Sequence, residues 1–208
     1  MIELVSFNRK IKQGFLQAAY MTNNFEILVN KIDLGIALDQ HEHLENQFVY
    51  CFEGVFDLFI QGQEDNVRRM KPGCSLTMVS HAEHSARAIS DFISLDFKYI
   101  DNAVKQDNSQ TQNLEKSLRR NYYVDELDLG TYIITRVEER LQDQPVRLRL
   151  EPEKSTFLIC SKNMDVIMAE SEYQLKPFLI YQIRKEEEMF SHMSDDSEFL
   201  ILEVASNE

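Results

Sequence analysis

The chain lacks the features that mark secreted and membrane proteins. None of its apolar runs approaches the roughly 20 residues that a membrane helix needs. Residues 1–5 lack the basic segment and the apolar core of a signal peptide. The chain has three cysteines, Cys51, Cys74 and Cys160, an odd number without a Cys-x-x-Cys pair. The sequence therefore predicts reduced thiols and a cytoplasmic protein that has no membrane partner.

Positive charge is also scarce. The 208 residues include 22 basic and 35 acidic side chains, which gives a net charge of −13. The basic doublets Arg68-Arg69 and Arg119-Arg120 are too small to form a patch that binds a phosphate backbone. The sequence therefore argues against nucleic acid as a partner. Its hydrophobic content of 43% and charged content of 27% are typical of a globular protein.

Short β-type runs fill the first half of the chain. Helical periodicity is weak there, β-branched and aromatic residues are frequent, and Gly54, Gly62 and Pro72-Gly73 separate the runs. The expected strands are residues 25–29, 32–38, 47–52, 55–60, 75–79, 84–89 and 92–97. Strands spaced about ten residues apart predict a small antiparallel barrel over residues 24–100.

A polar segment divides the chain. Residues 101–120 are rich in Gln, Asn, Asp and Lys, which predicts a linker with one amphipathic helix carrying Leu114 and Leu118. The β pattern resumes at residues 132–137, 146–150, 157–160, 166–168, 178–183 and 199–204. We therefore predict a first barrel over residues 1–100, a linker over 101–120 and a second barrel over 121–208.

The two halves contain a faint repeat. Residues 48–51 (FVYC) align with 157–160 (FLIC), and residues 92–97 align with 199–204. In the first alignment, His41, His43 and Gln47 fall on Leu150, Pro152 and Thr156. The second half therefore has the expected strands but lacks the metal-binding side chains of the first.

The side chains of the first half predict a metal site. Four of the five histidines lie between positions 41 and 84. His41 and His43 project to one side of an extended strand, and Gln47 can return to the same place on the next strand. His84 opens a later strand and is the expected fourth ligand. His81 is left open as an alternative ligand, a supporting residue or a surface residue.

Three imidazoles and one amide oxygen suit a divalent ion. Fe(II) is favoured, and Mn(II), Ni(II), Co(II) and Zn(II) are alternatives. Gln47 cannot accept a proton, so a catalytic base must come from elsewhere. By strand alternation Asp39 shares the face of His41, and Cys51 shares the face of Gln47. Either could act as a general acid or base. Asp39 could equally bind a histidine N–H, and Cys51 could equally be a core residue.

This region resembles the cupin superfamily. The first cupin motif reads G-x5-H-x-H-x3-4-E-x6-G, and the chain matches it with Gly35, His41, His43, Gln47 and Gly54. Gln47 replaces the usual Glu. Pro72-Gly73 and the later histidine resemble the looser second motif. The resemblance covers most of residues 24–100 and rests on strand pattern over 121–208.

The resemblance implies an all-β protein with two cupin-type barrels (double-stranded β-helix, or jelly roll) joined by a partly helical linker. The pattern is similar to the metal-bearing half of some bicupin isomerases of antibiotic biosynthesis, which carry metal in both halves. It implies a metal-dependent enzyme that acts on a small oxygen-bearing organic molecule by Lewis-acid isomerase, lyase or cyclase chemistry. An Fe(II)-dependent dioxygenase and a non-catalytic ligand-binding or regulatory barrel are the alternatives. A homodimer is also expected.

Overall fold

The computed structural model describes nine stretches of the chain: residues 2–61, 67–100, 115–119, 122–129, 131–139, 146–150, 154–183, 188–192 and 197–205. These residues are strands, turns and loops, and none of them is helical, so they include no helix that could cross a membrane. The chain divides into two compact units, residues 6–113 and residues 1–5 with 114–208. We call them the first and second barrel.

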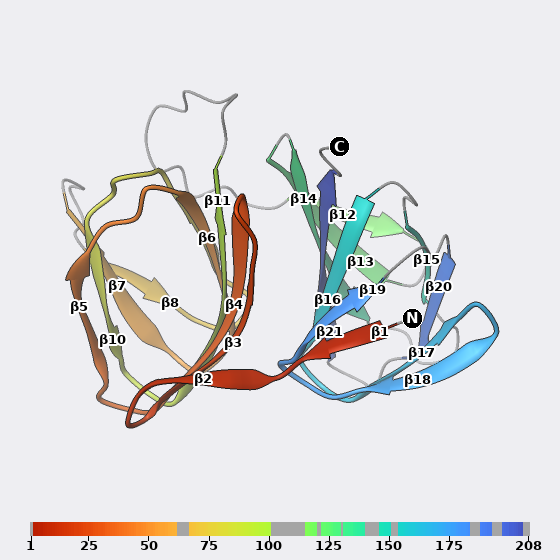
Figure 1. Ribbon diagram of the computed structural model, residues 1–208, viewed down its shortest axis with the longest axis horizontal. Helices are drawn as coiled ribbons and strands as arrows, with labels where there is room; N and C mark the ends of the chain where they lie inside the picture. Colours follow the sequence, from red (N-terminus) through yellow and green to blue (C-terminus); the bar gives the residue numbers. More distant parts are fainter. Residues whose placement is uncertain are drawn as a thin grey trace. The chain divides into compact units, whose positions relative to one another are not determined.

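The first barrel is made of two antiparallel sheets that face each other (Figure 1). One sheet has the order β2 (Phe7–Lys12), β3 (Phe15–Met21), β4 (Phe25–Ile32), β11 (Phe92–Tyr99), β6 (Asn46–Glu53) and β9 (Ser75–Met78). The other has the order β5 (Ala37–His41), β10 (His84–Ala88), β7 (Phe56–Ile60) and β8 (Val67–Met70).

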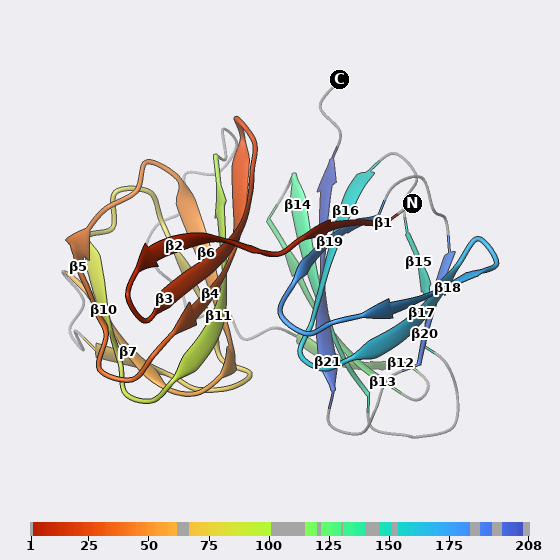
Figure 2. The same cartoon turned by 60° about the horizontal axis from the view of Figure 1, so that its bottom comes forward.

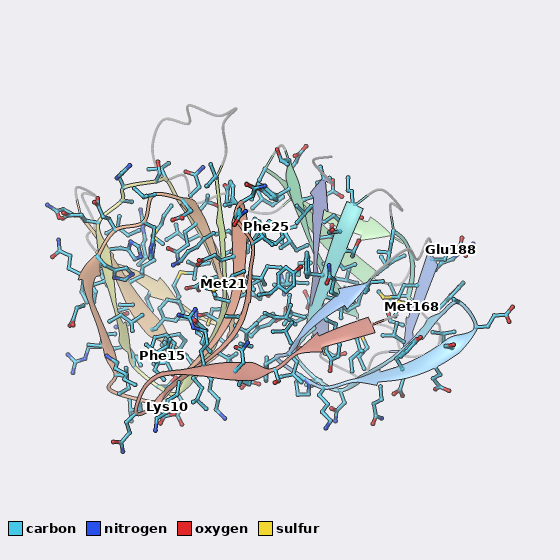
Figure 3. All side chains as sticks on the ribbon, in the orientation of Figure 1. Lys10, Phe15, Met21, Phe25, Met168 and Glu188 are labelled. Atoms are coloured by element: carbon cyan, nitrogen blue, oxygen red, sulfur yellow. The ribbon has the colours of Figure 1, made fainter. Side chains whose placement is uncertain are left out.

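An apolar core fills one part of the first barrel. It includes Phe15, labelled in Figure 3, together with Cys51, Phe56, Leu58 and further buried side chains from both sheets. Removing these side chains from water is the main term that stabilises such a unit. The rest of the interior is open to ligands, as described below.

The second barrel repeats the plan of the first. Its larger sheet has the order β1 (Ile2–Val5), β19 (Ile180–Ile183), β16 (Lys154–Cys160), β21 (Glu198–Ala205), β14 (Tyr132–Glu139), β13 (Tyr122–Asp128) and β12 (Glu115–Arg119). Its smaller sheet has the order β15 (Val146–Arg149), β20 (Glu188–His192), β17 (Met164–Met168) and β18 (Ser171–Leu175). Strands β16 and β21 take the places that β6 and β11 take in the first barrel. These are the strands that the sequence repeat aligned.

Two boundaries differ from those read off the sequence. Residues 2–5, placed in the first barrel by the sequence, form β1 and pair with β19 of the second barrel, with Ile2 opposite Ile183. Figure 2 shows this strand beside β19. The predicted helix is wrong over residues 115–119, because Leu118 lies in β12 and pairs with Tyr123 of β13. Leu114 lies outside the described residues.

The first predicted turn is also displaced. The sequence predicts a turn at residues 30–31, between the expected strands 25–29 and 32–38, but β4 continues through Ile32 and the chain turns around Gly35, whose φ is +81°. Asn30 stays in the strand because its side chain is buried in the barrel and bonds to Gln17 and Ser94. A polar side chain inside a barrel is indistinguishable from a turn residue when only its type is considered.

Candidate metal centre

Three imidazoles converge at one end of the cavity in the first barrel. Their ring centroids are 4.8 Å apart for His41–His43, 4.4 Å for His41–His84 and 5.2 Å for His43–His84. One ring nitrogen of each lies within 4.8 Å of the others. Nitrogens that bind one ion at about 2.1 Å are roughly 3–4 Å apart, so the three ring nitrogens lie near the spacing that a shared ion requires.

Strand pairing places two of these rings. His41 ends β5 and lies directly opposite His84, the first residue of β10. His43 lies just beyond the end of β5, and its carbonyl accepts a hydrogen bond of 2.7 Å from the backbone N–H of His81. The first ring pair is therefore fixed by the sheet, and the third ring is held by a loop-to-loop contact.

The hydrogen bonds of two histidines leave a lone pair for a metal. His41 donates from Nδ1 to the carbonyl of Asp39 at 2.7 Å, and His84 donates from Nδ1 to the carbonyl of Ala82 at 2.8 Å. A carbonyl can only accept, so each Nδ1 carries the proton and Nε2 carries the lone pair of the neutral ring. Metal-binding histidines are commonly oriented in this way.

Gln47 adds an unpaired acceptor. Its side chain is 5% exposed, and its Nε2 donates to Asp96 Oδ2 at 3.2 Å. Its Oε1 is buried without a hydrogen-bond partner. Because Asp96 accepts from the nitrogen, the amide is oriented with its oxygen free. A buried, unpaired oxygen that lines the same cavity as three imidazoles is a fit for a metal ligand.

The remaining predicted residues have other contacts. His41, His43 and His84 form the group of converging rings, which we call the trio. His81 is exposed and lies outside it, and its Nδ1 lies 3.6 Å from Glu42 Oε2. Asp39 lines the cavity and meets His41 through its backbone carbonyl. Cys51 is fully buried in the apolar core, and its Sγ donates to the Glu53 carbonyl at 3.4 Å. The acid–base roles suggested for Asp39 and Cys51 stay predictions, and packing accounts for Cys51.

Sequence reasoning missed a polar row inside the barrel. On β11 the side chains of Ser94, Asp96 and Lys98 line the cavity, whereas Leu95 and Phe97 alternate with them. The alternation is visible in the sequence, which predicts a strand over residues 92–97. What the sequence could not show is that the polar face is the inner one.

Hydrogen bonds run along this row toward Gln47. Gln17 donates to Asn30 Oδ1 at 2.8 Å, Asn30 donates to Ser94 Oγ at 3.3 Å, and Ser94 donates to Asp96 Oδ1 at 3.3 Å. This chain of hydrogen bonds ends at the Asp96 carboxylate, which also accepts the bond from Gln47. The row fixes the carboxylate that in turn fixes the amide of Gln47.

The cavity shifts the pKa of three groups. Burial lowers the pKa of His43 to about 3, and the positive charges of Lys98, His41 and His84 add to the effect. Burial also lowers the pKa of His84, although its bond to Ala82 opposes the shift. Burial raises the pKa of Asp96 to about 6, against the opposing effects of Lys98 and of its hydrogen bonds. At neutral pH His43 and His84 are neutral, as metal ligands must be.

These groups surround a cavity of about 370 Å³. Apolar side chains from both sheets line much of it, among them Phe15, Leu28, Ile32, Val49, Phe56 and Leu58. The trio, Gln47 and the polar row line the rest. The cavity therefore suits a small molecule that has an apolar body and a polar group.

No family model matches the chain, and no curated protein matches it in sequence. Solved structures do match it. AerE from Microcystis aeruginosa superposes with a TM-score of 0.72 at 12% identity, covering 99% of this chain and 97% of AerE. A cupin 2 conserved barrel domain protein from Leptotrichia buccalis superposes with a TM-score of 0.66 at 12% identity, covering 97% and 96%.

A third solved structure that matches the chain is that of an enzyme with metal centres. Oxalate decarboxylase from Bacillus subtilis, which has Mn(II) centres, superposes with a TM-score of 0.65 at 10% identity, covering all of this chain and 78% of the enzyme. The chain has the bicupin fold. These identities are low, so the likeness concerns the arrangement of strands and leaves the chemistry to be argued from the site.

Within this bicupin the trio belongs to the first barrel. Leu150, which the repeat aligned with His41, is buried in an apolar cluster of the second barrel. Thr156, aligned with Gln47, is buried in β16, and Pro152 lies outside the described residues. In the part of the second barrel that the structure describes, no comparable group of histidines and acidic residues is found.

Proposed function

We propose that this protein is a metal-dependent cupin enzyme that acts on a small oxygen-bearing organic molecule by isomerase, lyase or cyclase chemistry. The observation that carries the proposal is the convergence of three imidazoles on one side of a ligand-sized cavity that also contains the unpaired oxygen of Gln47. His41, His43, His84 and Gln47 would hold the ion. A bound divalent ion would act as a Lewis acid toward a carbonyl or carboxylate oxygen.

The described residues support the other parts of such a reaction. The apolar walls exclude water and orient the body of the substrate. Asp96 supplies the proton acceptor that Gln47 cannot be, since its raised pKa of about 6 suits a base at neutral pH. It lines the cavity and lies one hydrogen bond from Gln47.

Oxygen consumption separates the proposed Lewis-acid enzyme from the rival Fe(II) dioxygenase. The Mn(II) centres of oxalate decarboxylase, a protein of the same fold, are consistent with a divalent ion here. An Fe(II) dioxygenase would use the same four residues and would consume oxygen. Oxygen uptake by the Fe(II)-loaded protein with candidate organic acids distinguishes the two reactions, because Lewis-acid isomerisation or elimination consumes none.

Metal analysis tests the site itself. The purified protein should take up one equivalent of a divalent ion per chain, and His43→Ala and His84→Ala should abolish stoichiometric uptake. His81→Ala is the matched control, because His81 is a neighbouring histidine outside the trio, and it should keep full uptake. Full uptake in the variant that carries both trio substitutions would refute the ligand set. A protein that binds metal but turns over no organic acid would favour the non-catalytic binding module.

A further inference from the structure

Lys98 is an unusual residue to find beside a metal site. Its side chain is 14% exposed, and its Nζ lies 3.3 Å from His43 Nδ1. Burying an ammonium is unfavourable unless an anion compensates for it, and a cation bound beside it would add to the cost. Among the described residues, the carboxylate within ion-pair range is that of Glu26, at a distance of 3.9 Å, the outer limit for such a pair.

The bond from Lys98 to His43 competes with metal binding. A neutral imidazole has one nitrogen lone pair in the plane of its ring. Lys98 uses this lone pair when it donates to Nδ1. If His43 binds an ion through either nitrogen, its lone pair is taken and none remains for the ammonium. The metal-loaded protein must therefore pair Lys98 with another acceptor.

The neighbouring carboxylates give Lys98 little compensation. Asp96, two residues away on the same face of β11, bonds to Ser94 and Gln47, and no ion pair among the described residues joins it to Lys98. Glu26 is at its limiting distance. The open direction for the ammonium is the cavity, which Lys98 lines. A ligand with a negative charge would satisfy Lys98 there.

We propose that Lys98 binds the carboxylate of a small organic acid whose apolar body lies against the cavity walls, and that metal binding by His43 frees Lys98 to do so. This inference rests on the metal site of the proposed function. It narrows the substrate class from oxygen-bearing molecules to organic carboxylates. It also makes the two binding events cooperative, so each ligand raises the affinity for the other by the same factor.

Calorimetry with a matched pair of probes tests the inference. The probes are 3-phenylpropionate and its uncharged amide, 3-phenylpropanamide, titrated into Zn(II)-loaded and metal-free protein. The loaded wild type should bind the carboxylate at least about tenfold more tightly than the amide. It should also bind the carboxylate at least about tenfold more tightly than the metal-free protein does. Lys98→Met should remove most of the preference for the carboxylate while keeping amide binding and the zinc stoichiometry.

Two variants serve as controls. Lys31→Met should change nothing, because Lys31 is an exposed lysine of β4 that does not line the cavity. Lys98→Arg keeps the charge and should retain part of the preference. Equal binding of the two probes by the loaded wild type, or full carboxylate affinity in Lys98→Met, would overturn the inference and leave the metal site standing. A wild type that takes up no zinc would instead contradict the proposed function.

Discussion

At the scale of single residues, Asp96 orients one of the four side chains proposed to hold the ion. The usual cupin motif has Glu where this chain has Gln47, which removes a negative charge from the ligand set. A carboxylate lies one hydrogen bond away instead, because Gln47 Nε2 donates to Asp96 Oδ2. The carboxylate therefore orients a neutral ligand instead of coordinating.

Substituting Asp96 should weaken metal binding without disrupting the barrel. In Asp96→Asn the partner of Gln47 can donate as well as accept, so the amide loses its fixed orientation. We expect affinity for Zn(II) to fall roughly 10- to 100-fold, as is typical for partners of metal ligands. Competition titration against a chelator measures the change. Asp57→Asn is the control, because Asp57 is also buried but pairs with Arg69. A similar loss in both variants would contradict the role of Asp96.

The stability of the metal-free protein should depend on pH through two opposing groups. The pKa of His43 falls from 6.5 to about 3 on folding, so its contribution is full above pH 6.5 and is lost as the pH falls toward 3. The pKa of Asp96 rises from 3.8 to about 6, so its contribution is full below pH 3.8 and is lost as the pH rises through 6.

Two variants separate these effects in urea unfolding between pH 6.5 and 4. Relative to wild type, His43→Gln should gain stability as the pH falls, because it has no imidazole to protonate in the unfolded chain. Asp96→Asn should lose stability over the same interval, because it cannot take up the proton that stabilises the fold. Parallel pH profiles for wild type and both variants would show that neither group has a shifted pKa.

At the scale of elements, the two glycines of the cupin motif are required for different reasons. Gly35 and Gly54 have φ angles of +81° and +76°, in the left-handed region that favours glycine. A Cβ added at Gly35 would meet no atom within 4 Å, whereas one at Gly54 would lie 2.0 Å from the carbonyl oxygen of Asp91. The first glycine is required by conformation, and the second by conformation and by space.

Alanine at the two positions should therefore have unequal costs. Gly35→Ala should lower the free energy of unfolding by about 1–2 kcal/mol, the cost of a left-handed backbone. Gly54→Ala should lose about 1–3 kcal/mol more, because the backbone near Asp91 must move to admit the methyl group. Urea denaturation of the metal-free proteins measures both losses. Equal losses would mean that the close approach at Gly54 is relieved without cost.

At the scale of the whole molecule, the two barrels share a strand order but differ in their interiors. The first holds the trio and a polar row, while the second has an apolar cluster that includes Leu150, Val166 and Phe199. The first barrel contains the cavity of about 370 Å³, whereas buried apolar side chains pack against one another in the described part of the second.

Metal binding should accordingly stabilise one unit. At a free ion concentration of 100 times Kd, unfolding of the first barrel should cost about 2.7 kcal/mol more. Hydrogen exchange should slow in β5, β6 and β10 and stay unchanged in β15, β16 and β20. His84→Ala should abolish the protection. Equal protection of both barrels would contradict a single site in the first.

The sequence by itself determined the strand pattern, the two-barrel plan and the three histidines. Spacing along β-type runs is a local property, and alternation along a strand reports which residues share a face. It favoured His84, which opens a strand, and kept His81 as an alternative, because both follow the same turn. Pairing of β10 with β5 decided for His84.

Only the tertiary structure decided which face of β11 is inside. That choice brought Asp96 and Lys98 to a site about 50 residues away in sequence, where they contact Gln47 and His43. Pairing between strands also places residues 2–5 in the second barrel and residues 115–119 in a strand. Long-range strand pairing depends on partners that no local window contains, so local patterns identify the candidate ligands but not the charged side chains around them.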